Sequence, residues 1–334
     1  MITLHVDLGR QWRGGQSQAL LLIRGLRAEG HGAELVAREG SPLAQRARAA
    51  GLRVNGLSHL LRSGRFDVVH CHDAHGLTAA WLAGAARDSR LVASRRVAYP
   101  LARNPLARAR YRAARIIAVS QFVRDSVVAS GLPEGQIDVV YDGVELPDLA
   151  PPRSPSRRLG CVGYLLPEKG QELLIRALPL ILARYPDHRL LIAGDGPCRA
   201  ALERVAADLK VTQSVEFAGH VADVAAVYRS LDVFLFPSLA EPLGSALLTA
   251  MAYGLPAVAL AHGAIPEVIE DGRNGLAVSG DGPGPFAEAV LRLLDDAALA
   301  TRLGAAARAT VERRFSAAAM IEGTLQVYHR VLAC

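Results

Sequence analysis

Residues 232–260 read DVFLFPSLAEPLGSALLTAMAYGLPAVAL, and the order of elements in this stretch decides the fold. The apolar run DVFLFPS (232–238) has the length and composition of a buried strand. A glycine-containing turn then starts a helix near Gly244, and a second apolar run, PAVAL (256–260), follows. A strand, a helix and a strand in this order predict a parallel βαβ unit.

The same alternation extends through both halves of the chain, where short apolar runs rich in β-branched residues predict further buried strands. In the first half they are ITLHV (2–6), FDVVH (66–70), RLVAS (90–94), RIIAVS (115–120) and IDVVY (137–141). In the second half they are LGCVG (159–163), HRLLIAG (188–194) and SVEFAG (214–219). Helical periodicity appears in QSQALLLIRGLRAEG, in QELLIRALPLILARY and in SQFVRDSVVASG, for which Ser120 is the expected N-cap.

A change of composition separates the two halves. The stretch LPDLAPPRSPSRR (146–158) carries four prolines and no hydrophobic periodicity, which predicts a linker. We therefore expect an α/β protein of two Rossmann-like, doubly wound domains, over residues 1–150 and 151–315, with a terminal helix in 316–334 that packs back on the first domain. Ligands of such sheets bind at the carboxyl ends of the strands, so the two domains are expected to face each other across a binding cleft.

The overall composition excludes several classes of protein. With 51% hydrophobic and 21% charged residues in 334, the chain is predicted to be compact and soluble rather than disordered or fibrous. The four cysteines show neither a CxxC pair nor metal-ligand spacing, so we expect no zinc site, no disulfide framework and a reducing compartment. No signal-like N-terminus or 18-residue apolar stretch occurs, which favours a cytoplasmic protein.

The net charge of +6 is unevenly distributed. Between Ser89 and Arg124 there are nine arginines and no acidic residue: Arg90, Arg95, Arg96, Arg103, Arg108, Arg110, Arg112, Arg115 and Arg124. This segment suits a phosphate-rich acceptor or an anionic membrane surface, although a solvated surface explains it about as well. We expect Arg95, Arg96, Arg103 and Arg108 on the acceptor or membrane side. Nucleic acid is the least favoured partner, because no binding motif is present.

Two loops of the first half are candidates for binding. Gly14 and Gly15 follow the first strand and precede a helix, where backbone amides can approach an anion. The sequence CHDAHG follows the strand FDVVH, which places His70, His72 and His75 near the carboxyl end of that strand. No partner with ligand geometry is evident, so a metal site is not favoured over structural histidines. His72 is the histidine that we expect to donate a hydrogen bond to a sugar.

The second half carries denser signals. Lys169 in GYLLPEKG is expected at the start of a helix, where a cation and a helix N-terminus can both face a phosphate. The turn AGDGP supplies Gly194, Asp195 and Gly196 but lacks the third glycine of a dinucleotide fingerprint, which disfavours a dehydrogenase. In FPSLAEPLGSALL, the amides of Leu243, Gly244 and Ser245 are predicted to be open to sugar or phosphate oxygens, with Glu241 beside them.

In order and spacing, these pieces resemble glycosyltransferase family 4 (group 1), which are retaining enzymes of the GT-B fold. The resemblance covers nearly the whole chain. It is carried by the GG pair, VVHCHD, IIAVS, GYLLPEKG, LLIAGDGP, FAGH, DVFLFPS, Glu241 with Thr249 eight residues later, GLPAVA and GAIPEVIEDGRNG.

The resemblance implies transfer of a sugar, with retention, from a nucleotide-sugar donor to a lipid-linked or saccharide acceptor of a cell-surface glycan of the lipopolysaccharide type. A UDP-sugar is the first candidate donor, and neither a metal ion nor a cofactor is implied. It further implies that His72 contacts the donor sugar, Lys169 the diphosphate and Glu241 a sugar hydroxyl, while the backbone near Val221 contacts the base. Such an enzyme would work in the cytoplasm, at the inner face of the plasma membrane.

Two positions depart from the family pattern. Tyr164 stands where the family commonly has an arginine before the PEKG element, and Thr249 stands where it has a glutamate for the ribose. A lost charged acceptor costs about 1.5–3 kcal/mol, so we expect weaker nucleotide binding. The alternative is a GT-B module that binds a nucleotide-sugar or a partner and has lost efficient catalysis.

Overall fold

The computed structural model describes residues 1–88, 90–102, 104–148, 156–280 and 282–333. Its contacts divide the chain into two compact units. Unit 1 comprises Met1–Gly143 together with the C-terminal segment that begins at Ser316, and unit 2 comprises Val144–Phe315. The predicted domain boundary between positions 150 and 151 lies outside the described residues.

Unit 1 is built on a seven-stranded sheet in the order β3-β2-β1-β4-β5-β6-β7, and the paired strands are parallel. The strands are β1 (Ile2–Asp7), β2 (Gly32–Ala37), β3 (Val54–Asn55), β4 (Val68–Cys71), β5 (Arg90–Arg95), β6 (Arg115–Ala118) and β7 (Ile137–Val139). The helices are α1 (Gly14–Ala28), α2 (Pro42–Ala49), α3 (Ala74–Leu82), α4 (Ala85–Asp88), α5 (Pro105–Arg112), α6 (Gln121–Ala129) and α14 (Ala317–Ala333), with the 3₁₀ turns η1 (Leu57–Arg65) and η2 (Glu134–Gln136).

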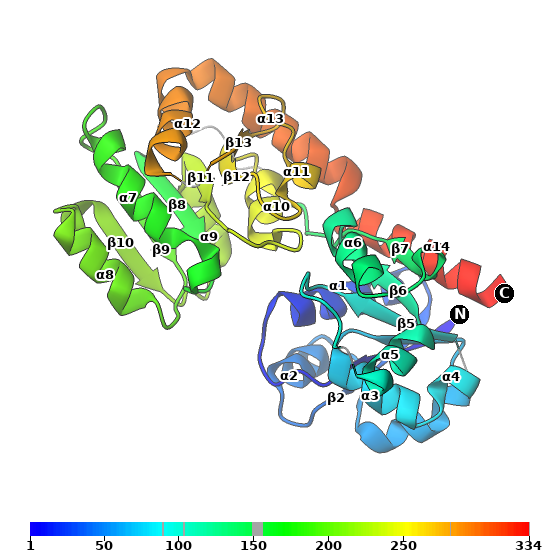
Figure 1. Cartoon of the computed structure of the whole chain (residues 1–334). Coiled ribbons are helices and arrows are strands. Elements are labelled where there is room, and N and C mark those ends of the chain that lie inside the picture. Colours follow the sequence, from blue (N-terminus) through cyan, green and yellow to red (C-terminus); the bar gives the residue numbers. More distant parts are fainter. Residues whose placement is uncertain (89, 103, 149–155, 281, 334) are drawn as a thin grey trace. The chain divides into compact units, whose positions relative to one another are not determined.

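Helices flank this sheet (Figure 1). Helix α1 packs against α2, and α3 packs against α4 and α5. The last helix, α14, packs against α1, and its apolar residues enter the same core, where Ile321 and Tyr328 lie with Leu22 and Leu26. Gly25 lies at the crossing, because a Cβ atom there would come within 2.0 Å of Ile321.

Unit 2 repeats the design with a six-stranded parallel sheet in the order β10-β9-β8-β11-β12-β13. Its strands are β8 (Arg158–Val162), β9 (Arg189–Ala193), β10 (Val215–Gly219), β11 (Val233–Phe236), β12 (Ala257–Leu260) and β13 (Leu276–Val278). The helices are α7 (Gln171–Leu182), α8 (Arg199–Asp208), α9 (Val224–Ser230), α10 (Ser245–Ala252), α11 (Ile265–Val268), α12 (Pro283–Asp295) and α13 (Ala297–Arg314), with the turns η3 (Pro167–Lys169) and η4 (Thr212–Ser214).

The two parallel sheets confirm the predicted doubly wound α/β architecture. Each apolar run that we expected to be a strand overlaps one, and Ser120 caps α6 by accepting a hydrogen bond from the amide of Val123 at 3.1 Å. Strands β2, β3 and β13 were not predicted. Their segments are short or interrupted by a polar residue, such as Glu34, which accepts a hydrogen bond from Asn55 at 2.8 Å.

Candidate active site

Most candidate residues of unit 2 lie on loops that follow β8, β9 and β11. The loops after β8 and β9 cross at very short range: a Cβ atom on Gly194 would lie 1.9 Å from the carbonyl oxygen of Gly163, and one on Gly196 would lie 2.5 Å from that of Leu165. Gly194 also has a φ of 145°, which other residues rarely adopt. The two glycines of AGDGP are therefore required by this crossing. Asp195 between them is exposed, and its carboxylate accepts the amide hydrogen of Gly196 at 2.8 Å.

The turn η3 holds Lys169 against the end of β11. Gly170 follows it with a φ of 68°, and a Cβ atom there would lie 2.1 Å from the carbonyl oxygen of Pro237. The amide of Leu239 donates to the carbonyl of Glu168 at 2.8 Å. Because these contacts fix the loop after β8 to the loop after β11, Lys169 is brought within reach of residues about seventy positions later in the chain.

Lys169 and Glu241 form the central contact of this region. The Lys169 Nζ donates to Oε2 of Glu241 at 2.6 Å, and the hydroxyl of Ser238 donates to the same oxygen at 3.0 Å. Glu241 is buried, while the lysine side chain is 29% exposed. The structure thus brings together two of the residues that the sequence singled out and adds Ser238, which the sequence analysis did not single out.

The helix α10 begins beside this ion pair. Gly244 precedes it with a φ of 98°, and no side chain caps the first turn. A Cβ atom on Gly244 would lie 3.5 Å from Cγ of Glu241. Within the described residues, the amides of Leu243, Gly244 and Ser245 donate to no backbone carbonyl, as expected for a helix start that is open to a ligand.

Thr249 lies one turn further along α10. Its hydroxyl donates to the carbonyl of Ser245 at 2.8 Å, within the helix. Tyr164, in the loop after β8, is 53% exposed, and Val221 is half-buried in the loop after β10. The two departures from the family pattern therefore differ in setting. The phenol of Tyr164 faces solvent, whereas the hydroxyl proton of Thr249 is donated to the carbonyl of Ser245.

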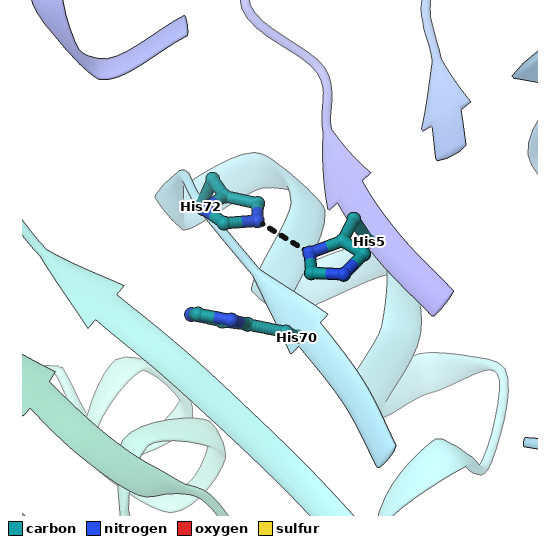
Figure 2. A group of neighbouring side chains, drawn as sticks. All are labelled: His5, His70 and His72. Atoms are coloured by element: carbon teal, nitrogen blue, oxygen red, sulfur yellow. Dashed lines mark hydrogen bonds between the residues drawn. The ribbon is translucent and has the colours of Figure 1, made fainter. Parts of the chain in front are cut away.

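In unit 1, His72 follows β4 and is 6% exposed. Its Nε2 lies 3.0 Å from Nδ1 of His5, and its Nδ1 lies 3.3 Å from Nη1 of Arg96 (Figure 2 shows the histidines). Burial lowers the pKa of His72 well below the usual value, with smaller contributions from His70 and Arg96. The side chain is therefore neutral, and both ring nitrogens have partners, so a hydrogen bond to a sugar requires one of them to be exchanged.

Arg96 is itself held from another side. Its Nε donates to both carboxylate oxygens of Asp142, at 2.9 and 3.1 Å. Burial raises the pKa of Asp142, opposed by the attraction of Arg96. The stem of Arg96 passes the first turn of α1, where a Cβ atom on Gly15 would lie 3.8 Å from it, next to Gly14. Arg96 and His72 thus meet beside the glycine pair.

The histidines His5, His70 and His72 have potential ligand atoms within 4.8 Å of one another. In this structure the three rings are engaged in hydrogen bonds with neighbouring side chains. The rings of His70 and His72 are tilted by 32° to each other, with their centroids 4.3 Å apart. In addition, His70 contacts the Tyr328 hydroxyl at 2.6 Å and the Ser94 hydroxyl at 2.8 Å. Each of its nitrogens is thus already engaged. His75 is exposed and lies outside this group.

The arginine-rich segment is not the single basic surface that the sequence suggested. Arg95 is buried, stacks on the Tyr99 ring at 4.8 Å and donates to the Tyr99 carbonyl, so its assignment to a membrane surface was wrong. Arg96 is bound to Asp142, and Arg108 is exposed. Arg103 lies outside the described residues. Arg110 binds Thr78, Arg115 binds Asp138 and Arg124 binds Glu134. Composition alone could not distinguish arginines whose guanidinium groups face the protein interior from arginines that face solvent.

Sequence reasoning also missed His5 and Asp142. A signal for His5 was present, because Thr3, His5 and Asp7 alternate along a buried strand and therefore face one side of the sheet. His5 pairs with His70 in the register of β1 and β4. Asp142 gave no such signal, since it lies 46 positions from Arg96 in a short loop after β7.

Among the described residues, no helix is both long and apolar enough to cross a bilayer. Comparison with solved structures shows the fold. The Anabaena protein Alr3699/HepE, in a complex with UDP-glucose, superposes with a TM-score of 0.84 over 99% of this chain and 100% of that one, at 19% identity. The lipopolysaccharide outer core galactosyltransferase WaaB in its apo form superposes with a TM-score of 0.76 over 98% and 99%, at 17% identity.

Curated relatives align over part of the chain. A GDP-mannose-dependent alpha-(1-6)-phosphatidylinositol monomannoside mannosyltransferase of Mycolicibacterium smegmatis is 33% identical over 63% of this chain and 60% of its own length. The lipopolysaccharide core biosynthesis glycosyltransferase LpsE of Rhizobium meliloti is 36% identical over 50% and 48%. The chain thus spans about half to three fifths of the length of these relatives.

Family profiles match both units. Residues 12–147 match the family described as Glycosyltransferase Family 4, and residues 156–296 match Glycosyl transferases group 1. The two profiles cover the glycine pair and the His72 loop in unit 1, and the Lys169–Glu241 pair and the start of α10 in unit 2. With the fold, the relatives and both profiles in agreement, the chain belongs to the group 1 (family 4) glycosyltransferases of the GT-B fold.

Proposed function

We propose that the protein transfers a sugar from a nucleotide-sugar donor to a cell-surface glycan or glycolipid acceptor, with retention at the anomeric carbon and without a metal ion. The observation that carries this proposal is the Lys169–Glu241 contact at the uncapped start of α10. A cation, a carboxylate and open amides in one place suit a ligand that carries both a diphosphate and sugar hydroxyls. The relatives named above as sugar transferases support the same reaction class.

In this proposal Lys169 binds the diphosphate, Glu241 accepts a hydrogen bond from a sugar hydroxyl, and the amides of Leu243–Ser245 bind sugar and phosphate oxygens. The backbone near Val221 contacts the base, and His72 lies on the sugar side. The acceptor oxygen bonds to the anomeric carbon as the bond to the leaving diphosphate breaks, and that diphosphate takes the acceptor proton on the same face. Catalysis then rests on positioning and on stabilising charge on the leaving group.

A donor panel tests the proposal. We propose a UDP-sugar as the first candidate, since UDP-glucose occupies the Anabaena structure, while the mannosyltransferase named above is GDP-mannose-dependent. Purified protein would be incubated with UDP-, GDP-, ADP- and CMP-sugars, and donor consumption followed by mass spectrometry. A nucleotide-sugar at 100 times its dissociation constant raises stability by about 2.7 kcal/mol, so thermal shift identifies the bound donor independently. The absence of turnover with every donor and acceptor would contradict the proposal.

The second candidate is a module that binds a nucleotide-sugar or a partner without efficient transfer. It is favoured by Tyr164 in place of a second phosphate cation and by the internal hydrogen bond of Thr249. Calorimetry separates the two candidates: nucleotide binding without transfer under conditions in which a related transferase is active favours the module. Transfer at an ordinary rate rejects it.

We further propose that unit 1 contacts an anionic membrane. The surface involved includes only part of the arginine-rich segment and adds residues from other elements. The turn η1 packs against α3 and α4, and α3 also packs against α5. These elements expose leucines, of which Leu61 is 77% and Leu82 is 68% exposed. The arginine–leucine surface consists of Leu57, Leu61, Leu82, Leu106, Arg62, Arg65, Arg87, Arg108 and Arg112, all exposed. Apolar and cationic side chains together suit the interface of an acidic bilayer, with about 1 kcal/mol for each cation.

Vesicle co-sedimentation tests this contact, which the proposal assigns to the inner face of the plasma membrane. Binding is expected to vesicles that contain phosphatidylglycerol, to weaken with salt, and to be lost in Leu61→Asp with Arg62→Glu. Arg313→Glu, an exposed position on α13 in unit 2, is the matched control and should bind as the wild type does. Equal binding to neutral vesicles of phosphatidylcholine alone, insensitive to salt, would contradict the proposal.

A further inference from the structure

A chain of hydrogen bonds in unit 1 has every donor on the same side of its acceptor. It runs from Arg96 through His72, His5 and Thr3 to the carbonyl of Gly32. At one end, the Thr3 hydroxyl donates to the carbonyl of Gly32 at 3.1 Å, so its oxygen is free to accept from Nε2 of His5 at 3.0 Å. A neutral His5 that is protonated at Nε2 has an unprotonated Nδ1, which can only accept. The proton in the 3.0 Å contact between His5 Nδ1 and His72 Nε2 therefore belongs to His72.

The other end of the chain requires the same arrangement. A guanidinium group only donates, so Nη1 of Arg96, at 3.3 Å, requires an unprotonated Nδ1 on His72. A neutral His72 then carries its proton on Nε2, which agrees with the assignment made from Thr3. Two independent ends, a backbone carbonyl and an arginine, thus specify one tautomer for each histidine.

These side chains lie in the protein interior, where water cannot replace their hydrogen bonds. Thr3 and His5 are fully buried, and His72 is nearly so. Burial lowers the pKa of His5 to about 3, so that the ring stays neutral in the folded protein. Because no bulk water reaches these rings, a change of tautomer at His72 would set an N–H against Arg96 and a lone pair against the lone pair of His5.

We propose that His5 is a positioning residue that holds His72 in its Nε2–H tautomer, so that the Nδ1 lone pair of His72 orients Arg96 toward an anionic group of the substrate. Asp142 fixes the Nε side of the same guanidinium, and the stem runs past Gly15 at the start of α1. The role of Arg96 rests on the proposed transfer of a sugar from a phosphate-bearing donor. The tautomer of His72 does not depend on it.

The first test is direct and needs no substrate. In protein labelled with ¹⁵N-histidine, long-range ¹H–¹⁵N spectra distinguish a protonated from an unprotonated ring nitrogen, and His72→Asn assigns the signals of His72. Wild-type His72 is expected to show a protonated Nε2 and an unprotonated Nδ1. His72 in the Nδ1–H form, or doubly protonated at neutral pH, overturns the proposal, whatever the transfer assay shows.

Two variants test the consequence. His5→Phe keeps a ring but removes the acceptor, whereas His5→Asn places a carbonyl oxygen near the position of Nδ1. We expect His5→Phe to give a mixed tautomer at His72 and a fall in kcat/KM of about tenfold or more, and His5→Asn to stay within about threefold of the wild type. His329→Phe, at an exposed position on α14, is the matched control and should change neither the tautomer nor the rate.

A third variant covers the case in which His5→Phe fails to fold. Thr3→Val conserves volume but leaves the Nε2 proton of His5 without an acceptor, and it should also mix the tautomers of His72. An unchanged tautomer in both Thr3→Val and His5→Phe overturns the positioning role. If the wild type transfers no sugar from any donor, the proposed function fails, while the spectra still decide the tautomer.

Discussion

The Nζ of Lys169 lies 2.6 Å from Oε2 of Glu241, although the two residues are 72 positions apart in the chain. The ammonium group thus has a carboxylate partner within the protein, and a diphosphate would compete with that partner for it. The pair also holds the loop after β8 next to the first turn of α10. This contact leads to the first prediction.

Lys169→Met is expected to lower kcat/KM by roughly 10²–10³, because it removes a cation from the leaving diphosphate and leaves Glu241 with Ser238 alone. Steady-state kinetics with the donor that the panel identifies will measure this. The chain's other lysine provides the control, since Lys210→Met lies on an exposed turn and should retain the wild-type rate. A Lys169→Met enzyme with normal kinetics would exclude a diphosphate role.

Thr249→Glu is expected to tighten nucleotide binding by roughly tenfold, because a carboxylate at this position can accept hydrogen bonds from ribose hydroxyls and the present hydroxyl donates to Ser245. Titration calorimetry with UDP and GDP will measure the change. Thr249→Val serves as the control and should bind as the wild type does. Unchanged or weaker binding in Thr249→Glu would mean that the ribose lies elsewhere.

Gly170→Ala is expected to destabilise unit 2 well beyond the conformational cost of a left-handed residue, which is about 1–2 kcal/mol. The added methyl group would meet the carbonyl of Pro237 and displace the loop that carries Lys169. Gly272→Ala isolates the effect of the close approach, since Gly272 has a similar φ of 71° but no atom within 4 Å of the added Cβ. Urea unfolding of the two variants should therefore differ clearly, and equal stabilities would refute the steric argument.

Tyr328→Phe is expected to lower the free energy of unfolding by about 1–3 kcal/mol, because the buried His70 loses its hydrogen bond to the hydroxyl of α14. Chemical denaturation at neutral pH will measure the loss. Tyr99→Phe, at a side chain that is 67% exposed, should change stability by less than about 0.5 kcal/mol. A stable Tyr328→Phe protein would show that water replaces the hydroxyl.

The buried histidines predict a pH dependence of stability. Burial lowers the pKa of His5 to about 3 and those of His70 and His72 well below the usual value, so these rings are neutral in the folded protein. In the unfolded chain they take up protons below about pH 6.5. Below that pH the unfolded state binds more protons than the folded state. The free energy of unfolding therefore decreases by about 1.4 kcal/mol for each histidine with every pH unit of acidification.

Above pH 6.5 these three residues contribute no slope, because both states are neutral. Urea denaturation between about pH 7.5 and pH 5 will follow the fall, and His5→Asn should reduce the slope by about one proton. A free energy of unfolding that is the same at both ends of this range would contradict neutral burial of the cluster.

Much of the fold follows from local patterns. Runs such as FDVVH and LLIA are long and apolar enough to read as buried strands, and a serine at the start of α6 identifies its cap. Strand β2 escaped detection because Glu34 interrupts its apolar run, and its partners Asn55 and His59 come from later elements. Three-residue strands such as β13 are too short for a periodicity to appear.

The sequence named residues of the candidate site but not their contacts. The sequence singled out Lys169 and Glu241 for different parts of a ligand, and only the crossing of loops at Gly170 and Pro237 shows that they touch. It singled out His72 as well, but its partners come from positions 67 and 24 residues away. Charge density alone also placed Arg95 on the surface, since composition does not reveal the aromatic ring and carbonyl that hold it inside.

The place of α14 in unit 1 has a consequence for synthesis on the ribosome. Its side chains complete the core against α1, and Tyr328 covers His70. Unit 1 therefore cannot finish packing when its first 143 residues emerge, and unit 2 is translated in full before the missing helix arrives. In a nascent chain arrested before α14, we expect α1 to expose its apolar face and offer a binding site to chaperones, even though unit 2 has every residue it needs.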